Sequence, residues 1–479
     1  MCLDTFGWQT STKIREILDD PITDLVDNHK EILCENPLKD FTRNRVFTPR
    51  VIINTLLQFE AKNTESELID IFDCKYQAGN INAALLMQRA KIRDGAFPYL
   101  FNTFTDNVLT SGLLTPPQIT GYDGGIFLAD GTGYNIAMNE KDPQTFIKPN
   151  GKKGNSQFHL NALYDFRNKA FVNAVVQGIK KKEERQALIK MITELDPAKK
   201  ALIIADRGYE SYNVFAACIE NYKDFIIRIK DIGSNGIMAS HAHKLPEGEF
   251  DLYISTILIK KKALKTERTK DIYTVLSPNT NFYYFDENGE YAIGFRIVRF
   301  LLSNGEYETI ATSLDRIKYG IDAIKELYND RWDCETAFRK LKTSLGLVHF
   351  HSRKMKYILQ ELYIKLILNN LICFVMEVVR SEDDERYGDF YETEESDALK
   401  DVTDIEDDIP PESCNTFRIG LAFSQAVTAC RKLFKGDWRK NIIDVIETIR
   451  AHTYRIKLYR NSVRNVKAQS WSPFNHRTS

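Results

Sequence analysis

Residues 125–130, GIFLAD, and residues 201–206, ALIIAD, are two short apolar runs that each end in an aspartate. Uninterrupted apolar runs of this length are typical of buried β-strands. Two similar runs lie between them, QFHLNALYDF at residues 157–166 and KAFVNAVVQGI at residues 169–179. The sequence therefore predicts four strands, of which the first three follow one another directly along the chain.

Helical patterns separate the later strands. EERQALIKMITEL at residues 183–195 precedes ALIIAD, and a helix from Ser211 to about Tyr222 leads to the strand DFIIRIK at residues 224–230. A three-stranded meander followed by alternating helices and strands is the element order of an α/β RNase H-like fold with a mixed sheet. We expect the first part of this core over residues 116–232.

The regions on either side of this core have different patterns. Residues 1–115 show helical signals, the clearest being Thr48-Pro49 as N-cap and first-turn proline ahead of VIINTLLQFE. Residues 233–312 are β-rich, with the segments DLYISTILIK, NFYYF and YAIGFRIVRFLL joined by turn sequences. These patterns predict a helical N-terminal domain and an inserted β-subdomain.

Charge is distributed unevenly along the chain, although the formal net charge of its 479 residues is only −1. Helical periodicity over residues 313–380 completes the expected core, and residues 381–413 then form an acidic loop with fifteen acidic and two basic residues. Residues 414–479 are helical and basic, with twelve Lys or Arg from Arg431 onward. The acidic run is interpreted as a solvated loop, and the basic region as a surface for DNA or a partner.

The composition favours a folded protein of the reducing cytoplasm. The apolar and charged fractions, 43% and 27%, are ordinary for globular proteins. The eight cysteines are scattered without a C-x-x-C pair, which indicates neither a zinc ribbon nor a disulfide framework. The most apolar long stretch, residues 358–379, contains Glu361 and Lys365, so it predicts a buried helix and not a membrane span.

Three acidic residues are candidates for a catalytic site. Asp130 and Asp206 end the first and fourth predicted strands, which can be neighbours in such a sheet, and Gly131 indicates a flexible turn after Asp130. Glu335 lies in the predicted helix ELYNDRWDCETAFRKLK. Carboxylates converging from different elements are what two-metal phosphodiester cleavage needs. Taken singly, the two aspartates could be turn residues and Glu335 half of a surface ion pair.

The residues around Glu335 follow a regular spacing. Four side chains are three, four and seven residues apart, which on one continuous α-helix keeps them on a single face: Tyr328, Arg331, Glu335 and Lys342. Such a face can hold Glu335 at a metal ion while Arg331 and Lys342 bind phosphates. Trp332 lies on another face and is expected to pack into the core.

Three further residues each allow two readings. Arg207, beside Asp206, and Arg228, on the DFIIRIK strand, can either contact DNA or orient acidic neighbours. His159 lies on an apolar strand, and it is interpreted as a core or edge histidine in preference to a metal ligand.

The strand end LADGT, the motif DRGY at residues 206–209 and the Tyr-Arg-Glu-Lys pattern together resemble the IS-four family of bacterial insertion-sequence DDE transposases. The resemblance extends over roughly residues 45–375. In that family the two Asp and the Glu coordinate two Mg²⁺ ions, which Mn²⁺ can replace, and the pattern's face contacts DNA near the cleaved end. The resemblance therefore implies that Asp130, Asp206 and Glu335 are catalytic metal ligands, and that the other members of the pattern bind DNA. It also implies that the helical N-terminal domain, residues 1–115, is a DNA-binding domain.

The resemblance also implies an activity and partners. It implies a transposase that cuts an insertion sequence at its terminal inverted repeats and joins the 3′ hydroxyls to target DNA. The expected assembly is a homodimer in a synaptic complex, acting in the bacterial cytoplasm at the nucleoid and without a membrane partner.

The sequence departs from the family in one respect, and it leaves two alternatives open. Some relatives carry a tryptophan in the insertion that stabilises a flipped-out base, whereas residues 233–312 contain none and Tyr307 is the nearest aromatic residue. One alternative is an RNase H-like nuclease that cleaves without strand transfer. The other is a domesticated or decayed transposase that only binds DNA.

Overall fold

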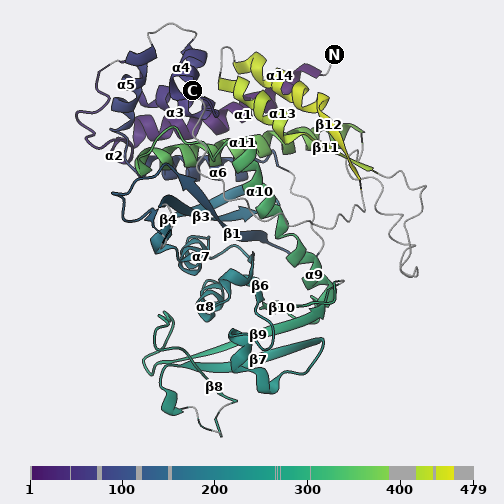
Figure 1. Cartoon of the computed structure of the whole chain (residues 1–479). Helices are drawn as coiled ribbons and strands as arrows, with labels where there is room; N and C mark the ends of the chain where they lie inside the picture. The colour runs from purple at the N-terminus through teal and green to yellow at the C-terminus, as the bar shows by residue number, and fades with distance from the viewer. Residues whose placement is uncertain are drawn as a thin grey trace. The chain divides into compact units, whose positions relative to one another are not determined.

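The computed structural model describes residues 3–43, 45–72, 78–114, 121–148, 151, 154–264, 266, 268–269, 271–302, 304–387, 417–434 and 438–457. These residues fold into two compact units (Figure 1). We call Pro117–Arg339 the sheet unit, and Met1–Pro116 together with Lys340–Ser479 the helical unit. Most of the expected acidic loop, and the basic residues after Lys457, lie outside the described residues.

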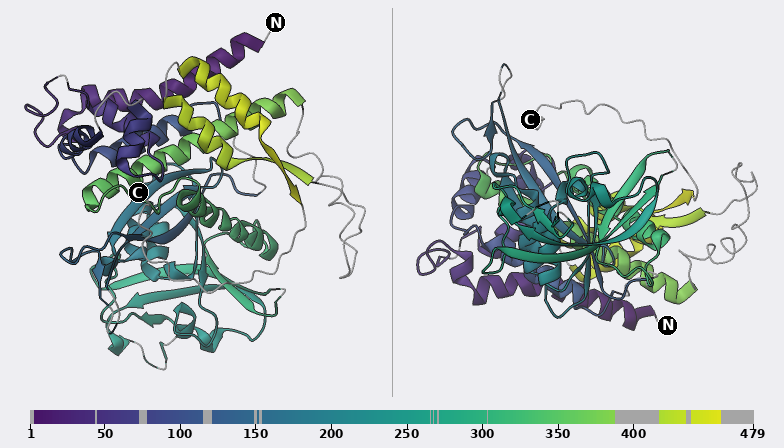
Figure 2. Two further views of the ribbon diagram at one scale, coloured as in Figure 1. Left: turned by 45° about the horizontal axis from the view of Figure 1, so that its top comes forward. Right: turned by 90° about the horizontal axis from the view of Figure 1, so that it is seen from below.

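The sheet unit is built on one twisted, ten-stranded sheet (Figures 1 and 2). Its strands are β1 Gly125–Ile136, β2 Phe146–Ile147, β3 Asn155–Asp165, β4 Ala170–Gly178, β5 Ala201–Ala205, β6 Asp224–Ile229, β7 Phe250–Ile259, β8 Tyr273–Val275, β9 Glu290–Leu301 and β10 Tyr307–Thr312. Strands β1, β3 and β4 form an antiparallel meander, and β5 and β6 add to β1 in parallel. The order β4-β3-β1-β5-β6 is RNase H-like, which confirms the predicted fold class.

The strands of the β-rich insertion continue this sheet. Strand β10 pairs with β6, β9 with β10, and β7 with β9, all antiparallel. The segment NFYYF, residues 281–285, is not a strand, contrary to our prediction. Its Phe282 packs against Tyr284, Phe285 and Tyr291 at centroid distances of 4.8 to 5.8 Å, so these rings form a cluster and not a ladder.

Helices of the sheet unit carry the segments around the candidate site. They are α7 Glu184–Thr193, α8 Tyr212–Glu220, α9 Ile321–Asn329 and α10 Trp332–Thr343, with 3-10 turns η2 Ile179–Lys181, η3 Arg207–Tyr209, η4 Ile237–Ser240, η5 Ala242–Lys244 and η6 Lys262–Leu264. The residues of α10 from Lys340 onward belong to the helical unit. α7 contacts β3 and β4, and α8 contacts β6. Their apolar side chains, such as Leu188 and Phe215, join Ala129 and Ala205 of the sheet in one buried core.

The helical unit surrounds the long helix α11, Met355–Tyr387. Its other elements are α1 Leu3–Thr23, the π-helix η1 Asp24–Asn28, α2 Lys30–Leu33, α3 Pro49–Gln58, α4 Thr64–Phe72, α5 Ala78–Arg89, α6 Ala96–Leu109, α13 Phe423–Arg431, η7 Lys432–Phe434 and α14 Trp438–Ala451. The Thr48 hydroxyl accepts the Val51 N–H at 3.3 Å, which confirms the predicted start of α3. The C-terminal region also contains an antiparallel pair, β11 Phe417–Leu421 and β12 Thr453–Lys457, which we did not predict.

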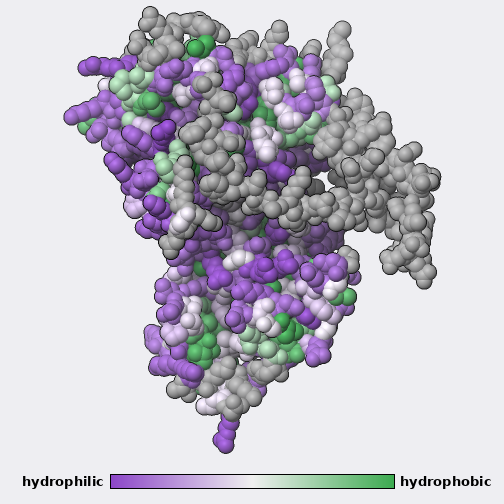
Figure 3. Space-filling view, viewed as in Figure 1, coloured by the Kyte–Doolittle hydropathy of each residue, from purple (hydrophilic) through white to green (hydrophobic). Residues whose placement is uncertain are grey.

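Helix α11 is long and apolar enough to cross a membrane by length and composition alone, but most of its apolar stretch is buried inside the protein. Its polar side chains have partners there: Lys365 Nζ donates to the Phe59 carbonyl, and Asn370 Nδ2 lies 3.2 Å from Thr105 Oγ1. The buried helix that we predicted is therefore confirmed. Figure 3 shows that hydrophilic side chains cover most of the viewed face in each unit.

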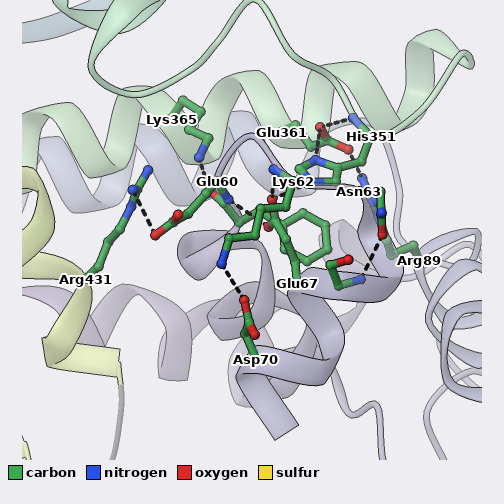
Figure 4. Close-up of polar contacts among 12 residues, drawn as sticks. Glu60, Lys62, Asn63, Glu67, Asp70, Arg89, His351, Glu361, Lys365 and Arg431 are labelled. Carbon is green, nitrogen blue, oxygen red and sulfur yellow. Dashed lines mark hydrogen bonds and ion pairs between the residues drawn. The ribbon is translucent and has the colours of Figure 1, made fainter. Parts of the chain in front are cut away.

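A buried network of charged groups joins three helices of the helical unit (Figure 4). His351 lies between two glutamates, with Nε2 3.1 Å from Glu67 on α4 and Nδ1 3.1 Å from Glu361 on α11. Arg89, at the end of α5, contacts Glu361 at 3.3 Å and donates to Gln360 at 3.0 Å. Buried charges of this kind are tolerated only when every group has partners, so the network specifies how these helices pack.

Candidate active site

The strand register brings Asp130 and Asp206 together. Strands β1 and β5 are parallel neighbours, and Ala129 is the register partner of Ala205. Asp130 and Asp206 are the next residues on the two chains. Because side chains alternate along an extended chain and the two alanines face the buried core, both aspartates point to the opposite face of the sheet. The prediction that the first and fourth strands are neighbours is confirmed.

Asp130 does not end its strand, which corrects one expectation. β1 continues through Gly131 to Ile136, because it pairs with β3 along this whole length. Only the parallel pairing with β5 stops at Ala129. Asp130 therefore lies where β1 loses one neighbour and keeps the other, and its position is set by a rigid strand. Its Oδ1 accepts the N–H of Gly131 at 2.7 Å.

Asp206 directly follows β5 and caps the 3-10 turn η3. Its Oδ1 accepts the Gly208 N–H at 2.8 Å, which fixes the side chain at the carboxyl edge of the sheet. Arg207, the next residue, is exposed. The sequence motif DRGY is thus a capped turn, with Tyr209 buried beneath it.

Glu335 reaches the site from α10, but the helix is not continuous as predicted. α9 ends at Asn329 and α10 begins at Trp332, and the intervening turn uses i→i+3 hydrogen bonds such as Arg331 N to Tyr328 O at 3.1 Å. Such bonds tighten the chain relative to an α-helix. Tyr328 and Glu335 therefore belong to different helices, so the assumption of one continuous helix was wrong. The side chains still gather around Arg331, whose guanidinium lies 5.7 Å from the Tyr328 ring centroid and 2.8 Å from Glu335.

Two contacts attach the first turns of α10 to the β3–β4 hairpin. Lys169 Nζ lies 2.6 Å from Asp333 Oδ2, and the rings of Phe171 and Phe338 are 5.5 Å apart. Because Glu335 lies between Asp333 and Phe338, both attachments restrain its position. The second and third candidate acids are thus held by separate elements of the same unit.

Arg331 is buried, with 6% of its surface exposed, and its Nη1 lies 2.8 Å from Glu335 Oε1. Its guanidinium lies 4.8 Å from the centroid of the Trp332 ring. Trp332 itself is 45% exposed, so our expectation that it packs into the core was wrong.

The electrostatic environment links the three acids. Burial raises the pKa of Asp130 to about 6, with further increases from the charges of Asp206 and Glu335. The Gly131 N–H and the charge of Arg331 oppose this increase. Burial also raises the pKa of Tyr328 to about 12. A buried carboxyl beside other carboxylates is a form of charge crowding that a cation relieves.

The donor chemistry suits a hard divalent cation, although the acids are not gathered into a preformed cage. Within the described ranges, no group of three His, Cys, Asp or Glu side chains is close enough to hold a metal ion. In each candidate acid one oxygen accepts a hydrogen bond, from Gly131, Gly208 or Arg331. Carboxylate oxygens are the ligands that Mg²⁺ prefers. The residues therefore fit such an ion, provided that Glu335 gives up its contact with Arg331 and binds the ion instead.

The candidate DNA-binding residues lie in different settings. Tyr328 is buried, and its hydroxyl has no hydrogen-bond partner among the residues that the structure describes. Arg228 on β6 lies 3.1 Å from Glu308 on β10, which favours its reading as a group that orients an acidic neighbour. Arg207 is exposed, and Lys342 lies in the last turn of α10, among the residues of the helical unit.

Two residues behind the aspartates were not assigned a role from the sequence. His159 on β3 lies 2.9 Å from Glu184, the first residue of α7. His159 was interpreted as a core or edge histidine, and Glu184 did not stand out, because a glutamate in the first helical turn is ordinary. Only the pairing of β3 with β1 places them beside the candidate site.

The raised pKa of Asp130 predicts an effect on stability. Folding favours the protonated carboxyl, so its contribution is complete below about pH 3.9 and is lost as pH rises through about 6. In EDTA we expect Asp130→Asn to stabilise the protein at pH 8 by up to about 3 kcal/mol, and to have no effect near pH 4. Thermal unfolding at the two pH values measures this difference. Asp322→Asn, at an exposed position, is the control; a destabilised Asp130→Asn protein at pH 8 would contradict the prediction.

Comparisons with known proteins give one family match. Residues 121–371 match the family described as Transposase DDE domain. The chain is also similar to the cryo-EM structure of piggyBac transposase in a synaptic complex with hairpin DNA, with a TM-score of 0.44 and 11% sequence identity. That alignment covers 98% of this chain and 89% of the other. A comparison with curated proteins gives no match.

Proposed function

Because this chain belongs to the transposase DDE domain family, we propose that it cuts the ends of an insertion sequence and joins the freed 3′ hydroxyls to target DNA. We assign it to the IS-four group on the pattern Tyr328, Arg331, Glu335 and Lys342. The observation that carries the proposal is the placement of Asp130 and Asp206 at one sheet edge, with the charge of Glu335 acting on the first of them.

The proposed roles follow from chemistry at these positions. Asp130, Asp206 and Glu335 would hold two Mg²⁺ ions, which when bound supply charge stabilisation and lower the pKa of an attacking hydroxyl group. The rigid strand β1 and the capped turn η3 would fix two of the ligands before DNA binds, so little reorganisation is needed during the reaction. The attachment of α10 to the β3–β4 hairpin would restrict the third ligand.

Arg331 has two proposed partners. In the described structure it neutralises Glu335 at 2.8 Å. If Glu335 served as a metal ligand, the guanidinium of Arg331 would lose this partner and could bind a DNA phosphate, to which it can make paired hydrogen bonds. Binding of the metal and binding of the DNA end would then be coupled through one side chain. Arg207, which is exposed beside Asp206, is a second candidate for phosphate contact.

The proposed partners are double-stranded DNA at the terminal inverted repeats and at the target, with a homodimer holding both ends. We place this activity in the bacterial cytoplasm at the nucleoid. The inverted repeats would be found in the DNA that flanks the coding sequence, bounded by short direct repeats. This DNA provides the substrate for the test.

The test is end cleavage by the purified chain. With Mg²⁺ or Mn²⁺, we expect a labelled DNA end to be cut so that it carries a 3′ hydroxyl, and to be joined to an unlabelled target duplex; with EDTA, we expect binding only. Scrambled terminal repeats are the control. Cutting without joining would favour the nuclease alternative, and binding without cutting in any metal would favour the alternative of a protein that only binds DNA.

A further inference from the structure

A histidine and a glutamate in contact lie directly behind the two candidate aspartates, on the opposite face of the sheet. His159 on β3 is buried, and its Nε2 is 2.9 Å from Glu184 Oε1, at ion-pair distance although the ring nitrogen is not aligned for a hydrogen bond. Lys182 Nζ also lies 2.9 Å from the same oxygen. The contact with His159 and the charge of Lys182 outweigh burial and lower the pKa of Glu184 to about 2, so this carboxylate is ionised at neutral pH.

The ring of His159 packs closely against the backbone of Gly131, the residue after Asp130. A Cβ atom at Gly131 would lie 2.4 Å from His159 Nε2 and 2.9 Å from Asn161 Oδ1. Both distances are well below ordinary van der Waals contact, so only glycine at position 131 allows the ring to lie this close to β1. The imidazole of His159 therefore packs against β1 at the point where its parallel pairing with β5 ends, next to Asp130.

Glu184 and Arg185 lie beside the turn that Asp206 caps, and Arg185 is hydrogen-bonded to it. A Cβ atom at Gly208 would lie 3.4 Å from Glu184 Oε2 and 3.0 Å from Asp206 Oδ1. Arg185 Nε donates to the Gly208 carbonyl at 3.1 Å. One oxygen of Glu184 thus faces His159, and the other faces the turn that Asp206 caps. The first turn of α7 contacts the supports of both aspartates.

We propose that Glu184 and His159 are positioning residues, which set the separation of the Asp130 and Asp206 carboxylates by holding Gly131 and Gly208 from behind the sheet. This inference rests on the proposed function. Neither residue touches the DNA or the metal ions in this role. Groups that orient metal ligands from a second layer typically change metal affinity or activity by about 10- to 100-fold when substituted.

The experiment compares Glu184→Gln with Glu183→Gln in the full-length chain. Glu183 is the exposed neighbouring residue, so its variant removes the same charge without touching His159 or Gly208. We expect Glu184→Gln to lower kcat for end cleavage, and to weaken Mg²⁺ binding to the DNA-free protein in calorimetry, each by about 10- to 100-fold. KM for the DNA end and the affinity for DNA in EDTA should stay unchanged. Glu183→Gln should match wild type in all four measurements.

A second variant makes the result independent of folding. His159→Gln should cause a similar loss, and the double variant should lose no more than either single variant, because the two residues act as one unit. Additive losses, or full Mg²⁺ affinity in a folded Glu184→Gln protein, would overturn the proposal. The result for Asp206→Asn distinguishes failure of the proposed catalytic site from failure of the positioning role. If it cleaves like wild type, the proposed site itself is wrong; if it is inactive while Glu184→Gln is unaffected, only the positioning role fails.

Discussion

Asp206→Asn is expected to lower the rate of DNA-end cleavage by roughly 10³-fold or more. A bound metal ion contributes several kcal/mol of charge stabilisation, and each 1.4 kcal/mol or so corresponds to a factor of about ten in rate. The asparagine side chain keeps an oxygen that can accept the Gly208 N–H, so the turn should retain its shape while the charge is lost. Single-turnover cleavage of a labelled end at saturating protein measures the change.

The control for this prediction is a matched removal of charge elsewhere in the sheet unit. Asp322→Asn changes an exposed aspartate on α9 whose partner is Lys325, and it should cleave at the wild-type rate. DNA affinity in EDTA should be the same for all three proteins. Loss of DNA binding in Asp206→Asn would show that the residue has a different role, and equal cleavage would remove Asp206 from the proposed site.

The second large effect is expected in the helical unit, where Glu361→Gln should reduce the stability of the protein by about 3–5 kcal/mol. Removing one partner of a buried ion pair leaves the other charge without compensation, and losses of this size are typical. Glu361 accepts the backbone N–H of His351 at 2.9 Å and contacts the side chains of His351 and Arg89. The variant would leave the buried Arg89 guanidinium, and the imidazole of His351, facing an uncharged amide. Thermal unfolding, with hydrogen exchange of the α11 amides, locates and measures the loss.

The same helix supplies the control. Glu377 pairs with Arg380 at 2.9 Å near the surface, and Glu377→Gln should cost less than about 1 kcal/mol. The dependence of stability on pH at acidic values provides a further check. Burial alone would raise the pKa of Glu361, but His351 and Arg89 lower it to about 2. Its contribution is therefore present above about pH 4.3 and is lost as pH falls towards 2, a dependence that Glu361→Gln should lack. A variant as stable as wild type would show that the network does not stabilise the helical unit.

Much of the fold could be predicted from the sequence, because the signals are local. The apolar runs that became β1, β3, β4, β5 and β6 each identify a strand without reference to any other part of the chain. The Thr48-Pro49 cap marks the start of α3 in the same way. The order of these elements then restricts the topology to an RNase H-like sheet. Burial of α11 also followed from its composition, since charged residues interrupt an otherwise apolar helix.

The candidate site was only partly predictable. The strand order suggested that Asp130 and Asp206 are neighbours, but the register of Ala129 with Ala205 depends on hydrogen bonds between residues far apart in sequence. The break between α9 and α10 contains no proline or glycine. The spacing of Tyr328, Arg331 and Glu335 therefore predicted one continuous helix. The exposure of Trp332 and the burial of Arg331 were also not predictable, because both depend on which distant segments pack against α10.

By itself, the sequence determined the order and type of most elements and which carboxylates follow the apolar runs of β1 and β5 or lie in the later helix, because apolar periodicity and turn residues act over a few positions. Only the tertiary structure decided what lies behind those carboxylates. His159 and Glu184 meet because β3 pairs with β1 and α7 packs across them, and His351 meets Glu67 and Glu361 because three helices converge. Such contacts depend on packing between distant segments, and no periodic pattern in the amino-acid sequence indicates that packing.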